Sequence, residues 1–291
     1  MLTRFLQIAS LALVSLLLSS CGGSSTSGLN LFITDAPIDE ATAVNISFAR
    51  IQLTGPDVTP QTLTLSQAAS VDLYQLQGGV TATIVSDLQI KPGNYTGLSI
   101  TIAADPINAQ SSITLPDGTH ILYLPKGVSP TVTMPIDFSL ASGGTVNMVI
   151  DFDLRRSIIQ DPNDSTKYLL IPSARAVQIP LSGTLTGSIA ASLITCLTPA
   201  VYIYQGDVTP TDENINAPAG SVQPFTTTLA GLNQTTGVYN FTAGFLPPGT
   251  YTVAFTCQAS LDVVNQANTI SFPSVTTAVV SAAATTFVAL Q

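Results

Sequence analysis

Apolar and polar side chains alternate along most of the chain after residue 28, and this period of two predicts β-strands. Leu29, Leu31 and Ile33 form one face of an expected opening strand. Short β-branched runs follow, separated by Gly, Pro, Asn and Asp, while helical periodicity is almost absent beyond residue 21. The pattern predicts an all-β protein of the sandwich type.

Two local signals refine the expected strands. Val44, Ile46 and Phe48 keep an even phase, and the phase then switches at Ala49-Arg50, which predicts a β-bulge because one extra residue reverses every later side chain. Asp117-Gly118 lies between two apolar alternating runs and predicts a tight hairpin.

Residues 148–155 carry the clearest group of polar side chains on a strand. The even positions are apolar, so that Asp151, Asp153 and Arg155 are expected on the opposite face. The favoured interpretation is an ion-paired face in which Arg155 neutralises its neighbours. Two alternatives stay open: a pair of carboxylates for glycoside hydrolysis, and a calcium site built from Asp151 and Asp153. Further oxygen ligands for such a site are Asp35, Asp39 and Glu40.

A second set of strands follows a break at residues 179–183. Tyr251, Val253, Phe255 and Cys257 fall on one face there, which directs Cys257 toward a core. Residues 91–96 and 248–252 resemble each other, since each predicts a tight turn that leads a tyrosine into a strand. We interpret this similarity as a feature common to β-sandwiches and not as evidence of an internal duplication.

The first 21 residues have the parts of a secretory signal. Arg4 supplies the positive charge, residues 5–18 are apolar, and Ser19-Ser20 precede Cys21. The segment resembles a bacterial lipoprotein signal, which implies cleavage before Cys21 and acylation of that cysteine. Acyl chains on Cys21 would anchor the protein to a membrane. Gly22 stands where an aspartate tends to hold lipoproteins in the inner membrane, so the outer membrane or cell surface is expected.

The expected organisation has four parts. They are a signal peptide over residues 1–20, a lipidated cysteine and flexible tether over 21–27, one β-sandwich domain over 28–180 and an Ig-like or prealbumin-like β-sandwich domain over 183–291.

Charge and cysteine content narrow the function classes. Removal of residues 1–20 leaves seven basic against 17 acidic side chains, a net charge of −10, which argues against binding of nucleic acid. With Cys21 acylated, Cys196 and Cys257 remain as an even pair in an oxidising compartment, and we expect them to form a disulfide. Three cysteines and one histidine are too few for a Cys/His zinc cluster.

The remaining candidate catalytic or ligand-binding residues are better explained by structural roles. His120, the single histidine, follows the predicted hairpin, and no Gly-x-Ser-x-Gly motif accompanies it. Tyr202 and Tyr204 share one face of a strand and could stack on a sugar, although a structural role is favoured. We therefore expect no enzymatic activity and no cofactor, with calcium as the one alternative.

Several separated motifs resemble one family of exported prokaryotic domains. These are residues 33–40 (Ile-Thr-Asp-Ala-Pro-Ile-Asp-Glu), the central Pro92-Gly93-Asn94-Tyr95, residues 151–157 (Asp-Phe-Asp-Leu-Arg-Arg-Ser) and residues 168–172 (Tyr-Leu-Leu-Ile-Pro). The family is the domain of unknown function forty-three eighty-two, and the resemblance covers roughly residues 28–180. Residues 183–291 resemble a carboxypeptidase-regulatory or prealbumin-like sandwich, chiefly through residues 246–253 (Leu-Pro-Pro-Gly-Thr-Tyr-Thr-Val).

These observations predict a lipoprotein that works by binding a glycan or a protein partner. A structural subunit of an extracellular polymer is the second hypothesis, because uncharged sheet edges invite strand addition and self-assembly. A hydrolase that uses Asp151 and Asp153 is the third.

Overall fold

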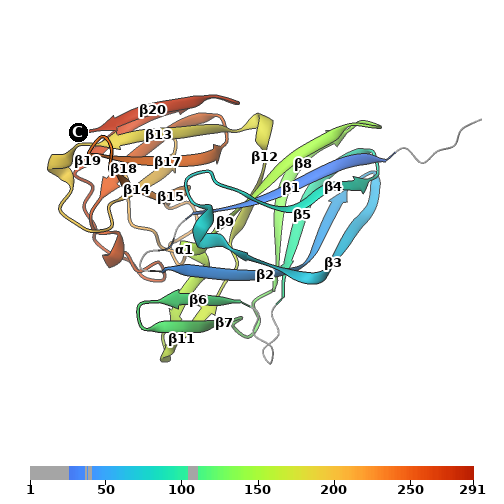
Figure 1. Ribbon diagram of the computed structural model, residues 1–291, viewed down its shortest axis with the longest axis horizontal. Helices are drawn as coiled ribbons and strands as arrows, with labels where there is room; N and C mark the ends of the chain where they lie inside the picture. The colour runs from blue at the N-terminus through green and yellow to red at the C-terminus, as the bar shows by residue number, and fades with distance from the viewer. Residues whose placement is uncertain (1–25, 37, 39–40, 104–110) are drawn as a thin grey trace, which may run out of the picture.

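A computed structural model describes residues 26–36, 38, 41–103 and 111–291. Almost all regular structure in these residues is β, arranged in four sheets (Figure 1). The sheets pack as two sandwiches, each around its own apolar cluster. This confirms the prediction of an all-β protein with two β-sandwich domains.

The first sheet of the first sandwich has the strand order β12-β9-β1-β4. Its strands are β1 (Ser27–Ala36), β4 (Ala82–Ile90), β9 (Thr145–Asp153) and β12 (Ala174–Gln178). β1 runs parallel to β9 with Asp35 opposite Phe152, and β9 runs antiparallel to β12. The ends of β1 and β9 therefore lie side by side.

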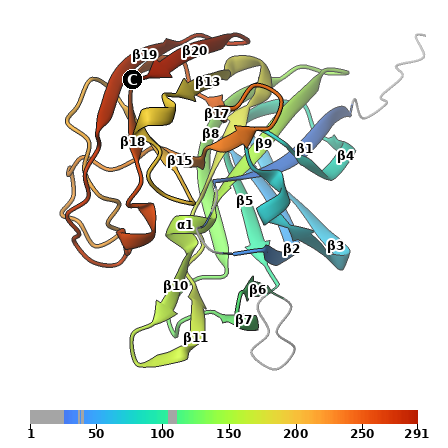
Figure 2. The same ribbon diagram turned by 60° about the vertical axis from the view of Figure 1, so that its left-hand side comes forward.

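The second sheet has the order β10-β11-β7-β6-β2-β5-β8, and β3 also pairs with β2. Its strands are β2 (Ala43–Gly55), β3 (Val58–Asp72), β5 (Gly93–Ile102), β6 (Ser112–Leu115), β7 (Gly118–Tyr123), β8 (Thr131–Leu140), β10 (Ile158–Asp161) and β11 (Asp164–Leu170). The predicted bulge is confirmed as a register shift between Phe48 and Arg50. The predicted hairpin at Asp117-Gly118 joins β6 to β7. β10 is an edge strand, and Figure 2 shows its hairpin with β11 at the bottom of the molecule.

Residues 183–290 form the other two sheets, with the orders β16-β17-β13-β20 and β15-β14-β18-β19. Their strands are β13 (Gly183–Ile189), β14 (Ala200–Gln205), β15 (Thr226–Leu229), β16 (Gly231–Asn233), β17 (Val238–Leu246), β18 (Gly249–Thr256), β19 (Ser274–Val280) and β20 (Thr285–Leu290). The Cys196–Cys257 disulfide is confirmed, with Cα atoms 5.4 Å apart. Cys257 packs against the core that Tyr251, Val253 and Phe255 help to form, as the alternation predicts.

Each sandwich contains one tyrosine that closes the turn before its own strand. The hydroxyl of Tyr95 donates to the carbonyl of Lys91 at 2.6 Å, and that of Tyr251 donates to the carbonyl of Pro247 at 2.8 Å. Both tyrosine side chains are fully buried. The predicted turns that lead a tyrosine into a strand are thus confirmed in both sandwiches.

Helical structure in the described part is confined to single turns. They are η1 (Leu73–Leu76), α1 (Leu154–Ser157), η2 (Ile179–Leu181), η3 (Ala191–Leu193) and η4 (Ala259–Leu261). None of the helices in the described residues has the length and apolar content to cross a bilayer. In Figure 1 the start of β1 and the second sandwich lie at opposite ends of the long axis.

Candidate functional site

Three of the predicted acidic residues, Asp35, Asp151 and Asp153, lie where β1 and β9 end. Asp35 and Asp151 are both buried, and Thr34 is opposite Asp151 in the parallel register. The carboxylate of Asp35 accepts a hydrogen bond from the backbone N–H of Leu154 at 3.2 Å. Asp39, Glu40 and the expected lipidation site Cys21 lie outside the described residues.

Arg175 neutralises Asp151. It lies directly opposite Asp151 on β12, and its guanidinium forms a salt bridge with the Asp151 carboxylate. The same guanidinium lies 4.1 Å from the centre of the Phe225 ring, and its Nη1 donates to the carbonyl of Phe225 at 3.2 Å. Arg175 therefore connects a carboxylate of the first sandwich to the chain of the second.

Asp153 ends β9 and caps the short helix α1. Its carboxylate accepts a hydrogen bond from the N–H of Arg156 at 3.0 Å. This turn shows that the expected position of Arg155 was wrong, because the strand alternation stops at Asp153 and the helix redirects the next side chains. The prediction that Arg155 neutralises Asp151 and Asp153 is corrected accordingly.

Arg155 instead enters the second sandwich. Its Nε lies 3.1 Å from a carboxylate oxygen of Glu213, and its Nη2 lies 3.4 Å from one of Asp262. Nη2 also donates to the backbone carbonyls of Ala259 and Asp262, at 2.9 Å each. The Arg155 side chain is buried and lies 5.4 Å from the centre of the Tyr202 ring.

The second sandwich holds its two carboxylates in place for this contact. The Tyr202 hydroxyl donates to Asp262 at 2.7 Å, and the backbone N–H of Glu213 donates to the same oxygen at 3.1 Å. Arg156 approaches the other oxygen of Glu213 at 3.7 Å. We call the connected side chains the joint: Asp151, Asp153, Arg155, Arg156, Arg175, Glu213 and Asp262.

The joint contains more carboxyl groups than cations. Burial raises the pKa of Asp153 to about 6, against the opposing effect of the Arg156 backbone hydrogen bond. Burial also raises the pKa of Glu213 to about 8; the charge of Asp153 adds to this rise, and Arg155 opposes it. The pKa values of Asp151 and Asp262 are raised by burial too. These shifts favour the protonated forms of the buried carboxyl groups, which offsets the surplus of four carboxyl groups over three arginines.

Sequence reasoning missed Arg175, Glu213 and Asp262. A signal was available, because the chain contains no Lys or Arg after Arg175. A buried acid of the second sandwich that pairs with an Arg or Lys must therefore find that cation in the first sandwich.

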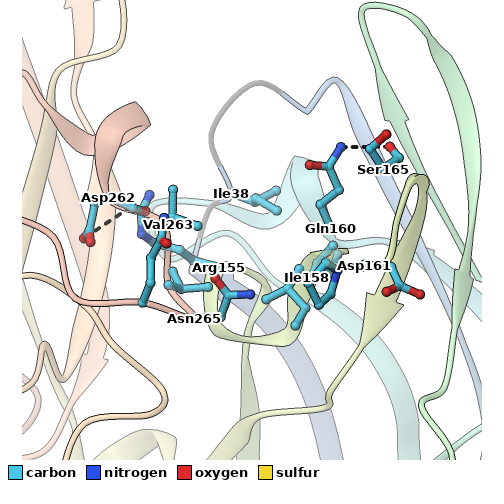
Figure 3. Close-up of a pocket in the computed structure, with 13 residues that line it drawn as sticks. Ile38, Arg155, Ile158, Gln160, Asp161, Ser165, Asp262, Val263 and Asn265 are labelled. Atoms are coloured by element: carbon cyan, nitrogen blue, oxygen red, sulfur yellow. Dashed lines mark hydrogen bonds and ion pairs between the residues drawn. The ribbon is translucent and has the colours of Figure 1, made fainter.

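Two hollows flank the joint. One, of about 440 Å³, lies between β10 and the loop after η4 (Figure 3). The other, of about 240 Å³, is lined by Asp151, Asp153, Arg156, Arg175 and Phe225, among others. Within the residues that the structure describes, no three His, Cys, Asp or Glu side chains are grouped to hold a metal ion. Calcium binding thus has no formed site to support it there.

The other predicted candidates have structural roles. His120 is half-buried, contacts Asp117 at 2.9 Å and packs beside the Tyr168 ring. Tyr202 and Tyr204 are fully buried in a small cluster with Phe272, so neither offers a flat surface for a sugar.

Comparison with solved structures finds distant likenesses. The chain is similar to the TIE protein of Bacillus anthracis, with 12% identity, 91% of this chain and 34% of that chain covered, and a TM-score of 0.20. It therefore spans about a third of that protein. It is also similar to the minor pilin GBS52 of Streptococcus agalactiae, with 12% identity, 89% and 93% coverage and a TM-score of 0.20. A third likeness is the fimbrial anchor protein Mfa2 of Porphyromonas gingivalis, with 10% identity, 84% and 82% coverage and a TM-score of 0.20. These low scores carry no functional argument.

No curated protein matches the chain. A family model, however, matches residues 26–172, which include β1, β9 and α1. The match thus includes Arg155 and Arg156, the arginines of α1 that contact Glu213 of the second sandwich. The match confirms the resemblance read from the sequence motifs, and the chain belongs to the family described as Domain of unknown function (DUF4382).

Proposed function

We propose that this protein is an exported lipoprotein that acts at the outer membrane or cell surface as a non-enzymatic binding module. The partner is a protein or a glycan. One observation carries the proposal: the charged side chains that could have served catalysis are used to join two sandwiches. Arg155 and Arg175 both connect the first sandwich to the second. Such a joint suits a body that presents a surface at a distance from its anchor.

The position of the anchor supports the same function. Cys21, the proposed site of acylation, lies six residues before β1, and β1 starts at the end of the molecule away from the second sandwich (Figure 1). A lipid on Cys21 would thus hold the first sandwich at the membrane and direct the second outward. Two or more acyl chains are enough for stable attachment.

Metabolic labelling tests the anchor. The full chain and a Cys21→Ser variant are expressed in a Gram-negative host that is fed an alkyne-bearing palmitate. We expect label on the parent alone, with the parent in the membrane fraction and accessible to protease on intact cells. Equal labelling of both proteins, or no labelling of either, would contradict the proposal.

A structural subunit of an extracellular polymer is the second candidate, and one observation favours it. The edge strands β19 and β20 expose Val275, Val279 and Phe287, and residues 263–291 carry no charged side chain. Uncharged apolar edges are prone to pairing between copies. Sedimentation of the purified chain discriminates the two, since a subunit forms large species with rising concentration and a binding module stays small.

A further inference from the structure

The hollow of about 440 Å³ beside the joint follows an unpaired strand edge. All four residues of β10 line it, namely Ile158, Ile159, Gln160 and Asp161. Successive side chains of a strand point to opposite faces, so a space that touches all four runs along the edge of the strand. β10 is the last strand of its sheet and pairs only with β11 among the described strands.

The register of β10 shows which backbone groups face this space. The carbonyl of Ser157 accepts from the N–H of Ile171, so Ser157 and Ile159 direct their backbone groups toward β11. Ile158 and Gln160 then direct theirs the other way. The N–H of Ile158, the residue after α1, donates to the carbonyl of Leu154. The carbonyl of Ile158 and both backbone groups of Gln160 remain directed into the hollow.

The opposite wall is a fixed loop of the second sandwich, residues 262–266. The carbonyl of Val264 accepts from Ile215 at 2.8 Å, and the carbonyl of Asn265 accepts from the Asn216 side chain at 2.7 Å. The Val263 side chain is 45% exposed and faces the hollow, as Figure 3 shows. The wall thus offers apolar and amide surface opposite an open strand edge.

We infer that this hollow binds an extended peptide of a partner protein, which adds as a strand to the free edge of β10. The inference rests on the proposed binding function and names the chemistry of its partner. Four residues of β10 rise about 3.3 Å each, so about four peptide residues can pair. Backbone hydrogen bonds then supply affinity for any extended peptide, while the peptide side chains that face Val263 determine which sequences are preferred.

Charge indicates one further feature of the peptide. Arg155 and Asp262, at the inner end of the hollow, are already paired with each other. Asp161, at the outer end, accepts hydrogen bonds from Asn163 and interacts electrostatically with Lys167, whose salt bridge is with Asp164. A Lys or Arg of the peptide beside Asp161 would form a salt bridge with the Asp161 carboxylate. The mature chain has a net charge of −10, which also favours a basic partner.

To test the inference, binders are selected from a random peptide library displayed on phage against the purified full chain. The selected peptides are then synthesised and their binding is measured. Selected peptides are N-methylated at one backbone amide at a time. Pairing with a strand predicts that methylation at every second position weakens binding by about tenfold or more, while the positions between change it little. Failure to select any binder, or a scan without this alternation, would overturn the inference.

Two variants at one position give the matched comparison. Gln160→Pro removes the inward N–H, and proline is tolerated at an edge position whose N–H is unpaired. Gln160→Ala keeps the backbone and removes only the amide side chain. We expect Gln160→Pro to abolish binding and Gln160→Ala to keep it within about threefold. Equal binding by the parent and a folded Gln160→Pro overturns the inference, and the methylation scan decides the matter if that variant does not fold.

The outcome can be separated from that of the proposed function. If the parent is acylated and displayed, and Gln160→Pro binds its partner unchanged, only the strand addition fails. If Cys21→Ser leaves acylation and membrane attachment unchanged, the proposed function fails whatever the peptides show.

Discussion

The Nε atom of Arg155 lies 3.1 Å from a carboxylate oxygen of Glu213, although the two residues belong to different sandwiches. Both side chains are buried, at 5% and 1% exposure. Arg155 comes from the helical turn that ends β9, and Glu213 from the long loop between β14 and β15. One contact thus ties a family motif of the first sandwich to a loop of the second.

The first prediction removes the cation of this contact. Arg155→Ala leaves the buried Asp262 carboxylate without the guanidinium that contacts it, and breaking a buried pair costs about 3–5 kcal/mol. We expect a matching loss in the free energy of unfolding by urea. Lys167→Ala is the control, because its salt bridge with Asp164 has side chains 49% and 34% exposed. That variant should change stability by less than about 0.5 kcal/mol, and an equally mild Arg155→Ala would contradict the account of the joint.

The second prediction concerns pH. The folded protein holds the Glu213 proton up to about pH 8, while the ordinary value in an unfolded chain is 4.5. Between these values the folded state binds more protons, so the free energy of unfolding falls as the pH rises from 4.5 to 8. Asp153, with a pKa of about 6, contributes in the same direction. Melting temperatures measured across this range should therefore decline toward pH 8.

Glu213→Gln is the matched variant for that measurement. Glutamine keeps the shape and cannot ionise, so the decline with pH should become shallower and the variant should exceed the parent in stability near pH 8.5. An effect of roughly 1 kcal/mol corresponds to about 2–4 °C in a protein of this size. A variant with the same slope as the parent would assign the pH dependence to other groups.

The third prediction concerns the disulfide. Cys196 and Cys257 are 61 residues apart in sequence, and opening such a loop costs about 2–4 kcal/mol. Cys196→Ser with Cys257→Ser should lower the melting temperature of the second sandwich. Mass spectrometry of the unreduced, unfolded parent should find neither thiol free, and a reactive Cys196 or Cys257 there would contradict the disulfide.

The local parts of the fold could be predicted from the sequence because they depend on neighbouring residues. The bulge after Phe48, the hairpin at Asp117 and the tyrosine turns all follow from short patterns. The alternation through residues 148–155 predicted that Arg155 belongs to the strand. This prediction was wrong because the strand ends at Asp153, whose side chain caps a helical turn. A carboxylate that accepts a backbone N–H overrides the strand pattern at that point.

The candidate site could be predicted only in part, for a different reason. Asp35, Asp151 and Asp153 all lie at the ends of the parallel neighbours β1 and β9, but Asp35 is opposite Phe152 and therefore on the other face of the sheet from Asp151 and Asp153. Their partners depend on how one sandwich lies on the other, which no local pattern encodes. Only the absence of Lys and Arg after Arg175 carries that information in the sequence.

The last prediction tests whether the joint couples the unfolding of the two sandwiches. Tyr95→Phe and Tyr251→Phe each remove one hydroxyl that donates to a carbonyl, at a cost of about 1 kcal/mol. If the joint makes the sandwiches unfold together, each substitution lowers one shared calorimetric transition by a similar amount. In an Arg155→Ala background the transition should split, and Tyr95→Phe should then lower only the transition of the first sandwich and Tyr251→Phe only that of the second. Two separate transitions in the parent itself would contradict coupling through Arg155, because a buried charged contact between two domains raises the cooperativity of both.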